Sequence, residues 1–134
     1  MSLVCTIENK YVDKFMAILL LGVLHSLERG AVTIDESELL VFCPFFARTL
    51  RRKGCDKELL DIIYHGCELE DIESLIPERL ETVIQELILQ TTDLIYTKRD
   101  DYPLSDWICP YISRHLLSLN PLLARCRRYS RGER

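Results

Sequence analysis

The sequence predicts an all-α protein, a compact single-domain helical bundle of five to seven helices with two long central helices. Its 134 residues are 48% hydrophobic and 28% charged, which is enough apolar material for one buried core. Apolar residues recur at spacings of three and four along much of the chain, as on one face of a helix. Glycine and proline are few, with five of each, and most lie where a predicted helix begins or ends.

The first long helix is predicted over residues 11–29. Apolar residues cover nearly all of its circumference, which is typical of a central helix packed on several sides. Gly30 follows the charged pair Glu28 and Arg29, and a glycine in that place commonly ends a helix. The second-best interpretation of the flanking segments is a short extended pair, formed by residues 3–7 and 31–34.

A short helix is predicted next, at about residues 34–43. Thr33 and Glu36 are three residues apart, which is the spacing of a capping box. Pro44 then suits the first turn of another short helix, because proline lacks the N–H that a helix interior needs. Gly54 ends that helix.

Asp56 is a suitable cap for a third short helix, KELLDIIYH, which ends at Gly66. The second long helix begins at Pro77 and continues to Lys98. Its apolar residues keep the 3-4-3-4 spacing of one helical face. They are Leu80, Val83, Ile84, Leu87, Ile88, Thr91, Leu94 and Ile95.

After Lys98 the helical period is lost, and RDDYPLSDWICPYIS contains two prolines. We expect a helical core domain at residues 1–98 and a C-terminal extension at residues 99–134. The extension is expected to pack on the core through Trp107 and to end in a basic tail.

Several classes of protein are not expected. The first residues lack a secretory signal, and the longest apolar stretch, residues 15–24, is about half of what a membrane span needs. We therefore expect a soluble cytoplasmic protein with no membrane partner. The six cysteines include no CxxC pair, so zinc and redox motifs are not expected, and most should be buried as small apolar side chains.

The segment HGCELEDIESLIP, residues 65–77, threads carboxylates between apolar residues. Its apolar residues are Leu69, Ile72, Leu75 and Ile76. On a helix they cluster within about a third of the circumference, and the carboxylates point outward. Outward carboxylates do not converge on a metal ion or form a catalytic acid–base pair. The candidate partner-binding residues of this acidic face are Glu68, Glu70, Asp71, Glu73, Glu78 and Glu81.

The sequence contains no recognised catalytic motif. Phosphate-loop, dinucleotide-binding, metalloprotease and nucleophile-elbow patterns are all absent. His65 and Cys67 are too close in sequence to face one another on a helix as base and nucleophile. We therefore predict a non-enzymatic protein with no catalytic residue, no cofactor and no metal.

Charge is distributed unevenly, although the net charge is only −4. Residues 61–93 contain nine acidic residues and one basic residue, whereas residues 48–57 and 125–134 each carry a net charge of +4. The acidic stretch repels nucleic acid and attracts a basic protein surface. The main basic residues are Arg48, Arg51, Arg52 and Lys53 in the first patch, and Arg125, Arg127 and Arg128 in the tail.

These patterns favour a non-enzymatic protein-binding module. Its sharper form is an immunity- or antitoxin-like protein whose acidic helical face blocks a basic toxin. The alternative is a regulator that contacts nucleic acid or another assembly through the basic patches, although no recognised nucleic-acid-binding motif accompanies them. The apolar faces of the two long helices permit a homodimer without requiring one.

Three strings resemble a small bacterial family of uncharacterised proteins, a domain of unknown function. They are LGVLHSLERG at residues 21–30, SELLVFCP at residues 37–44 and GCELEDIESLIP at residues 66–77. The resemblance covers about residues 10–98. It implies a compact helical fold in the bacterial cytoplasm, and it implies no activity.

Overall fold

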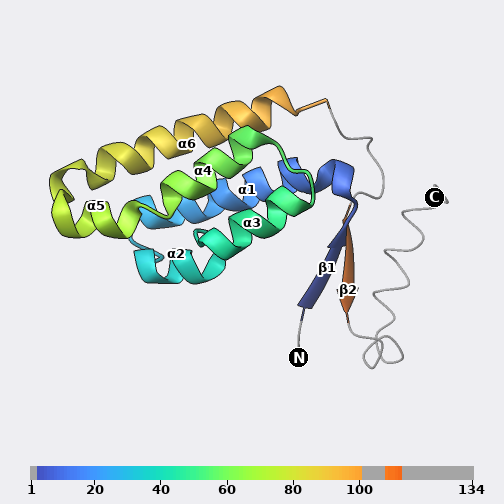
Figure 1. Cartoon of the computed structure of the whole chain (residues 1–134), viewed down its shortest axis with the longest axis horizontal. Coiled ribbons are helices and arrows are strands. Elements are labelled where there is room, and N and C mark those ends of the chain that lie inside the picture. Colours follow the sequence, from blue (N-terminus) through green and yellow to red (C-terminus); the bar gives the residue numbers. More distant parts are fainter. Residues whose placement is uncertain (1–2, 101–107, 113–134) are drawn as a thin grey trace. The chain divides into compact units, whose positions relative to one another are not determined.

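The computed structural model describes residues 3–100 and 108–112. The chain divides into two compact units, Val12–Arg99 and the pair of segments Met1–Tyr11 and Asp100–Arg134. Apart from the turns between its helices, the unit Val12–Arg99 is helical, as the sequence predicts (Figure 1). Its elements are α1 (Asn9–Glu28), α2 (Ile34–Leu40), α3 (Pro44–Arg52), α4 (Lys57–Gly66), α5 (Leu69–Leu75), the 3-10 helix η1 (Pro77–Arg79) and α6 (Leu80–Thr97).

Two strands depart from the all-α prediction. β1 (Leu3–Ile7) pairs antiparallel with β2 (Ile108–Ile112), so that Leu3 lies opposite Ile112 and Ile7 opposite Ile108. Residues 3–7 are therefore extended, but their partner is β2 and not residues 31–34, which lead into α2. Short strands that pair across most of the chain leave no hairpin turn in the local sequence, and so the pairing was not predictable from pattern.

The two longest helices, α1 with 20 residues and α6 with 18, run antiparallel. Near the start of α1, Lys14 Nζ donates to the backbone carbonyl of Arg99, just beyond the end of α6, at 3.1 Å. At the other end, the Gln85 side chain donates to the Glu28 carboxylate. The predicted helix over residues 77–98 is in fact η1 followed by α6.

The core of the helical unit is formed by all the major helices. Its fully buried large side chains include Leu20, Leu24, Phe42, Leu59, Ile63, Leu69 and Leu87. The two buried hydroxyls bond within their own helices, Ser37 to the Ile34 carbonyl at 2.7 Å and Thr91 to the Leu87 carbonyl at 2.6 Å. Burial therefore leaves neither hydroxyl without a partner. Ile18 and Leu19 remain exposed, so α1 is less completely enclosed than its apolar sequence predicts.

The predicted capping box is confirmed. The Glu36 N–H donates to Thr33 Oγ1 at 3.1 Å, and the Thr33 N–H donates to Glu36 Oε2 at 2.8 Å. The helix ends at Leu40, earlier than predicted, because the N–H groups of Val41 and Phe42 both turn back to the Ser37 carbonyl. This turn directs the Phe42 ring into the core.

Asp56 is the N-cap residue of α4, but its side chain makes no capping hydrogen bond. Its N–H donates to Asp13 Oδ1 of α1 at 2.9 Å, and its carboxylate pairs with Lys98 after α6. The start of α4 is therefore fixed to α1 and to the end of α6.

The sequence predicts that the C-terminal extension packs on the core and that the protein does not span a membrane. Trp107 and nearly all of the extension lie outside the described ranges, so the packing of residues 99–134 on the core stays a prediction. None of the helices in the described ranges combines the length and apolar character that a bilayer span requires.

Gly66 ends α4 directly against the Phe42 ring. A Cβ atom at residue 66 would overlap that ring, which is only 1% exposed and cannot move aside without disturbing the core. Gly22, within α1, differs because, apart from its chain neighbours and the nearby backbone of its own helix, no atom lies within 4 Å of its Cβ position.

The two glycines should therefore respond oppositely to alanine. Gly66→Ala should lower the free energy of unfolding by about 1–3 kcal/mol, because the core must shift to admit a methyl group. Gly22→Ala should raise it by about 0.5–1 kcal/mol, because alanine restricts the unfolded chain and favours the helix. Chemical denaturation of both variants would measure the difference, and equal effects would contradict the close contact at Gly66.

Candidate functional site

The six predicted partner-binding carboxylates lie on three consecutive elements. Glu68 is the N-cap residue of α5, and the others belong to α5, η1 and the first turn of α6. All six side chains are exposed. They are Glu68, Glu70, Asp71, Glu73, Glu78 and Glu81, and we call this set the acidic face.

The apolar side of this segment differs from its prediction. Leu69 is fully buried and Ile72 is half-buried, but Leu75 is 76% exposed and Ile76 is also exposed. The helix ends at Leu75 because Ile76 leaves it, with φ −140° and ψ 59°, as residues before a proline tend to do. The acidic face therefore contains an exposed leucine among its carboxylates.

The structure adds Glu38, which sequence reasoning did not select. Glu38 lies on α2, which packs against α5, and its carboxyl group is close to Glu70 and Asp71. Partial burial is the largest cause of the raised pKa of Glu38, since burial disfavours the charged form of the carboxyl group. The negative charges of its acidic neighbours and a hydrogen bond with Glu70 raise this pKa further.

The helical pattern predicts that each carboxylate points separately into water. The structure differs at Glu70 and Asp71, which lie close to Glu38 of α2. Glu38 and Glu70 come from two different helices, and the negative charge of Glu70 acts on the Glu38 carboxyl group and contributes to its raised pKa. Within the described ranges, no group of three or more His, Cys, Asp or Glu residues is arranged to hold a metal ion.

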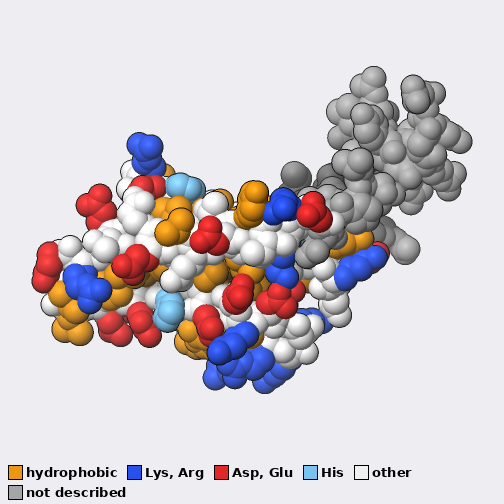
Figure 2. Space-filling view, turned by 90° about the horizontal axis from the view of Figure 1, so that it is seen from above, with side chains coloured by type: hydrophobic (Ala, Val, Ile, Leu, Met, Phe, Trp, Pro, Cys, Tyr) orange, Lys and Arg blue, Asp and Glu red, His pale blue; other side chains and the backbone are white. Residues whose placement is uncertain are grey.

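Two cavities of about 370 Å³ each lie along the junction of α4 and α6, and the first of them reaches the acidic face. Glu68 lines the first cavity, together with His65, Arg79, Glu86 and Gln90 among its polar residues. Figure 2 looks onto the α6 side and shows carboxylates distributed over this surface with hydrophobic side chains between them. Most of these lining residues fall outside the quoted segment, which is why the sequence alone did not group them.

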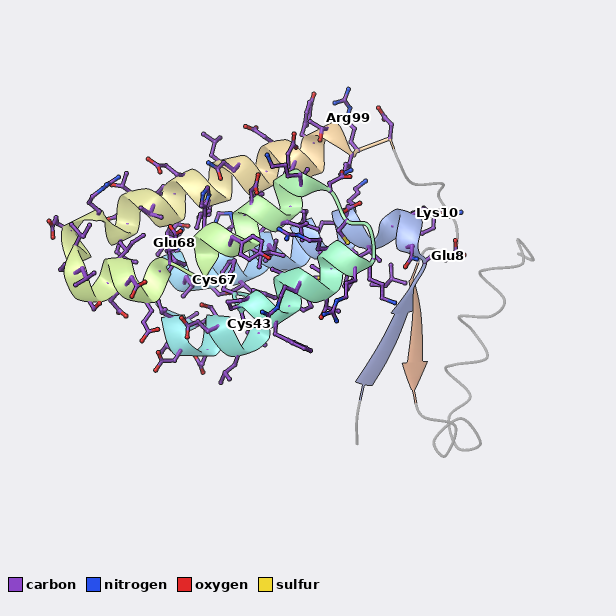
Figure 3. The ribbon with its side chains drawn as sticks, in the orientation of Figure 1. Glu8, Lys10, Cys43, Cys67, Glu68 and Arg99 are labelled. Carbon is purple, nitrogen blue, oxygen red and sulfur yellow. The ribbon has the colours of Figure 1, made fainter. Side chains whose placement is uncertain are left out.

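The described cysteines are free and only partly buried. Figure 3 shows Cys67 beside Glu68 at the corner between α4 and α5, and Cys43 at the start of α3. Burial raises the pKa of the Cys67 thiol to about 11, and the negative charges around it act in the same direction. Burial, followed by the charge of Asp13, likewise raises the pKa of Cys55 to about 11. The side chains of Cys5, Cys109 and Cys126 lie outside the described part.

The first basic patch is also exposed. Arg48, Arg51 and Arg52 lie on α3, and Lys53 is its C-cap residue. The Arg51 guanidinium lies over the Tyr64 ring, 5.6 Å from its centroid. The tail residues Arg125, Arg127 and Arg128 lie outside the described ranges.

Comparison with known proteins gives a family and one partial relative. The model of a family described as a protein of unknown function, DUF3969, matches residues 8–109. The chain is 65% identical over 46 residues to "Protein YoeA" of Escherichia coli strain K12, a match that covers 34% of the chain and 35% of that protein. The matched part thus spans about a third of this curated relative. No solved structure matches the chain.

Replacing Glu38 should reveal the strained carboxyl pair. Because its folded-state pKa is raised, Glu38 favours folding when protonated, and this contribution is lost as the pH rises through that pKa. Glu38→Gln should therefore raise Tm by about 2 °C at pH 7 and by less at pH 4. Thermal melts at both pH values would measure this, and a lower Tm for the variant at pH 7 would refute it.

Cys67 should be a slow nucleophile. A thiol pKa of about 11 leaves very little thiolate at pH 7.5, so iodoacetamide should modify Cys67 about 100-fold more slowly than an ordinary exposed cysteine. Peptide-level mass spectrometry would follow the reaction. The same residue in unfolded protein is the control, and equal rates in the two states would contradict the assigned environment.

Proposed function

We propose that this chain, which belongs to DUF3969, a family of proteins of unknown function, is a non-enzymatic protein-binding module. Its binding surface is the acidic face, and its partner carries a basic surface. Family membership supplies no activity, so the proposal rests on the chemistry of this surface.

The observation that carries the proposal is the exposure of Leu75 among carboxylates. A leucine that is 76% exposed at the end of α5 has no role in the core. Protein interfaces commonly combine a few apolar anchors with a polar rim that is complementary to the partner in charge. Leu75 supplies such an anchor, and Asp71, which lies one turn earlier on α5, supplies a negative charge on the same side of the helix.

The surface of α2 extends this arrangement. Because α2 packs against α5, Glu38 joins the acidic face to two further exposed apolar residues, Leu39 and Leu40, of which Leu39 is 88% exposed. Phe45 follows at the start of α3 and is also exposed. A contiguous patch of exposed apolar side chains is typical of interaction surfaces, and in this proposal these residues extend the binding surface beyond α5.

The sharper form of the proposal is an immunity- or antitoxin-like role. Residues 61–93 carry a net charge of −8, which attracts a basic toxin over long range and accelerates its capture. In such a role the acidic face covers the basic surface that the toxin uses, and no catalytic group is needed.

A regulator that contacts nucleic acid is the second candidate. It is supported by the exposure of Arg48, Arg51, Arg52 and Lys53 on one short helix and its cap. Binding to DNA or RNA by this patch should weaken steeply as salt rises, since each phosphate contact releases counterions. A salt titration with both nucleic acids separates this candidate from the first.

Charge reversal tests the acidic face. A photo-crosslinking residue at position 75 in the full-length chain would first identify the bound protein, which would then be purified. Glu70→Lys together with Glu73→Lys should lower its association rate constant by about tenfold or more at low salt, because exposed rim charges act mainly on association. Stopped-flow fluorescence would measure the rate.

The controls separate local charge from net charge. Glu8→Lys is compared with Glu73→Lys alone, because each changes the net charge by the same amount on an exposed residue, and Glu8→Lys should alter the rate much less. The effect of the double variant should also shrink at high salt, where exposed charges are screened. An unchanged rate for the double variant would exclude the acidic face.

A further inference from the structure

We propose that the groove between α4 and α6, which continues to α5, binds an amphipathic cationic helix of the partner protein. This inference rests on the proposed protein-binding function and assigns the docking element of the partner. The groove lies beside the acidic face, and apart from Glu68 its carboxylates are different residues.

The groove follows from the antiparallel packing of α4 and α6. The first cavity is lined by residues from α4, α5, η1 and α6, and the second by residues of α4 and α6. His65 and Gln90 line both cavities, so the two form one continuous depression. From Val83 to Thr97, α6 rises by about 20 Å, which equals about four turns of an α-helix.

The floor of the groove is apolar. Ile62, Leu87 and Leu94 are buried residues that reach it, and Ile72 and Val83 are half-buried. A helix laid between two antiparallel helices can place one apolar stripe against such a floor, at positions i, i+3, i+4 and i+7.

The rim of the groove is strongly acidic. Its carboxylates are Glu58, Asp61, Glu68, Glu86 and Asp93. All five are exposed, and within the described ranges none of them forms an ion pair with a Lys, Arg or His side chain. Among the residues that line these two cavities, Arg79 is the one Lys or Arg.

The apolar floor and the acidic rim together indicate which kind of partner the groove can bind. An anionic polymer such as RNA is repelled by five carboxylates, whereas lysine or arginine side chains on the flanks of a helix neutralise them. The apolar floor requires leucine-like side chains on the facing stripe of that helix. The occupant is therefore a helix of about 14 residues with one apolar face and basic flanks.

The acidic face and the groove then act at different stages. Glu70 and Glu73 do not line either cavity, and they steer the partner towards the protein. The groove holds the helix after contact, so changes to its floor act mainly on dissociation.

A synthetic helix tests the groove without knowledge of the natural partner. The probe is a fluorescent peptide of about 18 residues with leucines at helical spacing and lysines elsewhere. Its matched control has the same composition with the leucines scattered round the helix. The full-length chain should bind the amphipathic peptide at least about tenfold more tightly than its isomer, as fluorescence anisotropy would show.

Two double variants with equal charge changes locate the binding site. Asp61→Lys with Asp93→Lys should weaken peptide binding by about tenfold, because both residues flank the groove. Glu70→Lys with Glu73→Lys should weaken it by less than about threefold. Circular dichroism melts would establish that both variants fold. Equal losses in the two variants, or equal binding of the two peptides, would overturn the inference.

A change in the floor provides a charge-neutral test. Val83→Thr keeps the shape of the side chain and replaces a methyl group with a hydroxyl, so it should increase the peptide dissociation rate by about threefold to tenfold. An unchanged dissociation rate would show that the peptide does not reach the floor.

Other occupants give distinct results. If the peptide binds only after Arg125, Arg127 and Arg128 are replaced by glutamate, the groove belongs to the end of this same chain and the inference is wrong. If the peptide merely dissociates a dimer detected by sedimentation, the occupant is a second copy. If the peptide fails to bind but Glu70 and Glu73 still govern partner association, the proposed function stands without the helix. If the peptide binds in the groove but changes at Glu70 and Glu73 leave partner association unchanged, the groove is supported and the acidic face is excluded.

Discussion

The contact between Phe42 and Gly66 positions the whole candidate surface. Phe42 leaves the end of α2 and enters the core, where its ring lies against the last residue of α4. This contact fixes the turn between α2 and α3 against the corner between α4 and α5. Because residue 66 has no side chain, the two segments approach closely enough for α2 to pack beside α5. The meeting of Glu38 with Glu70 is a consequence of that approach.

That meeting is unfavourable for folding alone. Glu38 lies close to Glu70 and Asp71, and burial together with their negative charge raises its pKa. A surface that served only to keep the protein hydrated would gain stability by placing a lysine among these residues. Natural proteins tolerate such local strain where a binding surface benefits from it. The needs of the fold therefore do not explain the clustered carboxylates, and their charge is complementary to the basic partner that we propose.

Local features of the fold were predictable from the sequence, and tertiary ones were not. The capping box of Thr33 and Glu36 depends on residues three positions apart, so its pattern alone was sufficient. The exposure of Leu75 was not predicted, because the helical pattern placed Leu75 with the apolar residues of α5. The helix ends at Leu75, since Pro77 disfavours a helical conformation at Ile76.

The proximity of Glu38 to α5 arises from packing between helices that are distant in sequence, and no periodicity encodes it. The same reason applies to the pairing of β1 with β2 and to the groove, whose two sides come from α4 and α6. Sequence patterns report which face of an element is apolar, but they do not report which other element covers it.

The charges that we propose to attract a basic partner also disfavour self-association through the acidic face. Leu39, Leu75 and Phe45 are exposed apolar residues, and such residues promote aggregation when nothing opposes it. Around Leu75 and Leu39, a second copy would bring an equal set of carboxylates into close contact, and like charges repel at short range. In the proposed function, repulsion of a second copy and attraction of the basic partner thus come from one set of residues. A homodimer, where it forms, is better served by the exposed Ile18 of α1 and by Leu89 and Tyr96 of α6, which lie outside the acidic face.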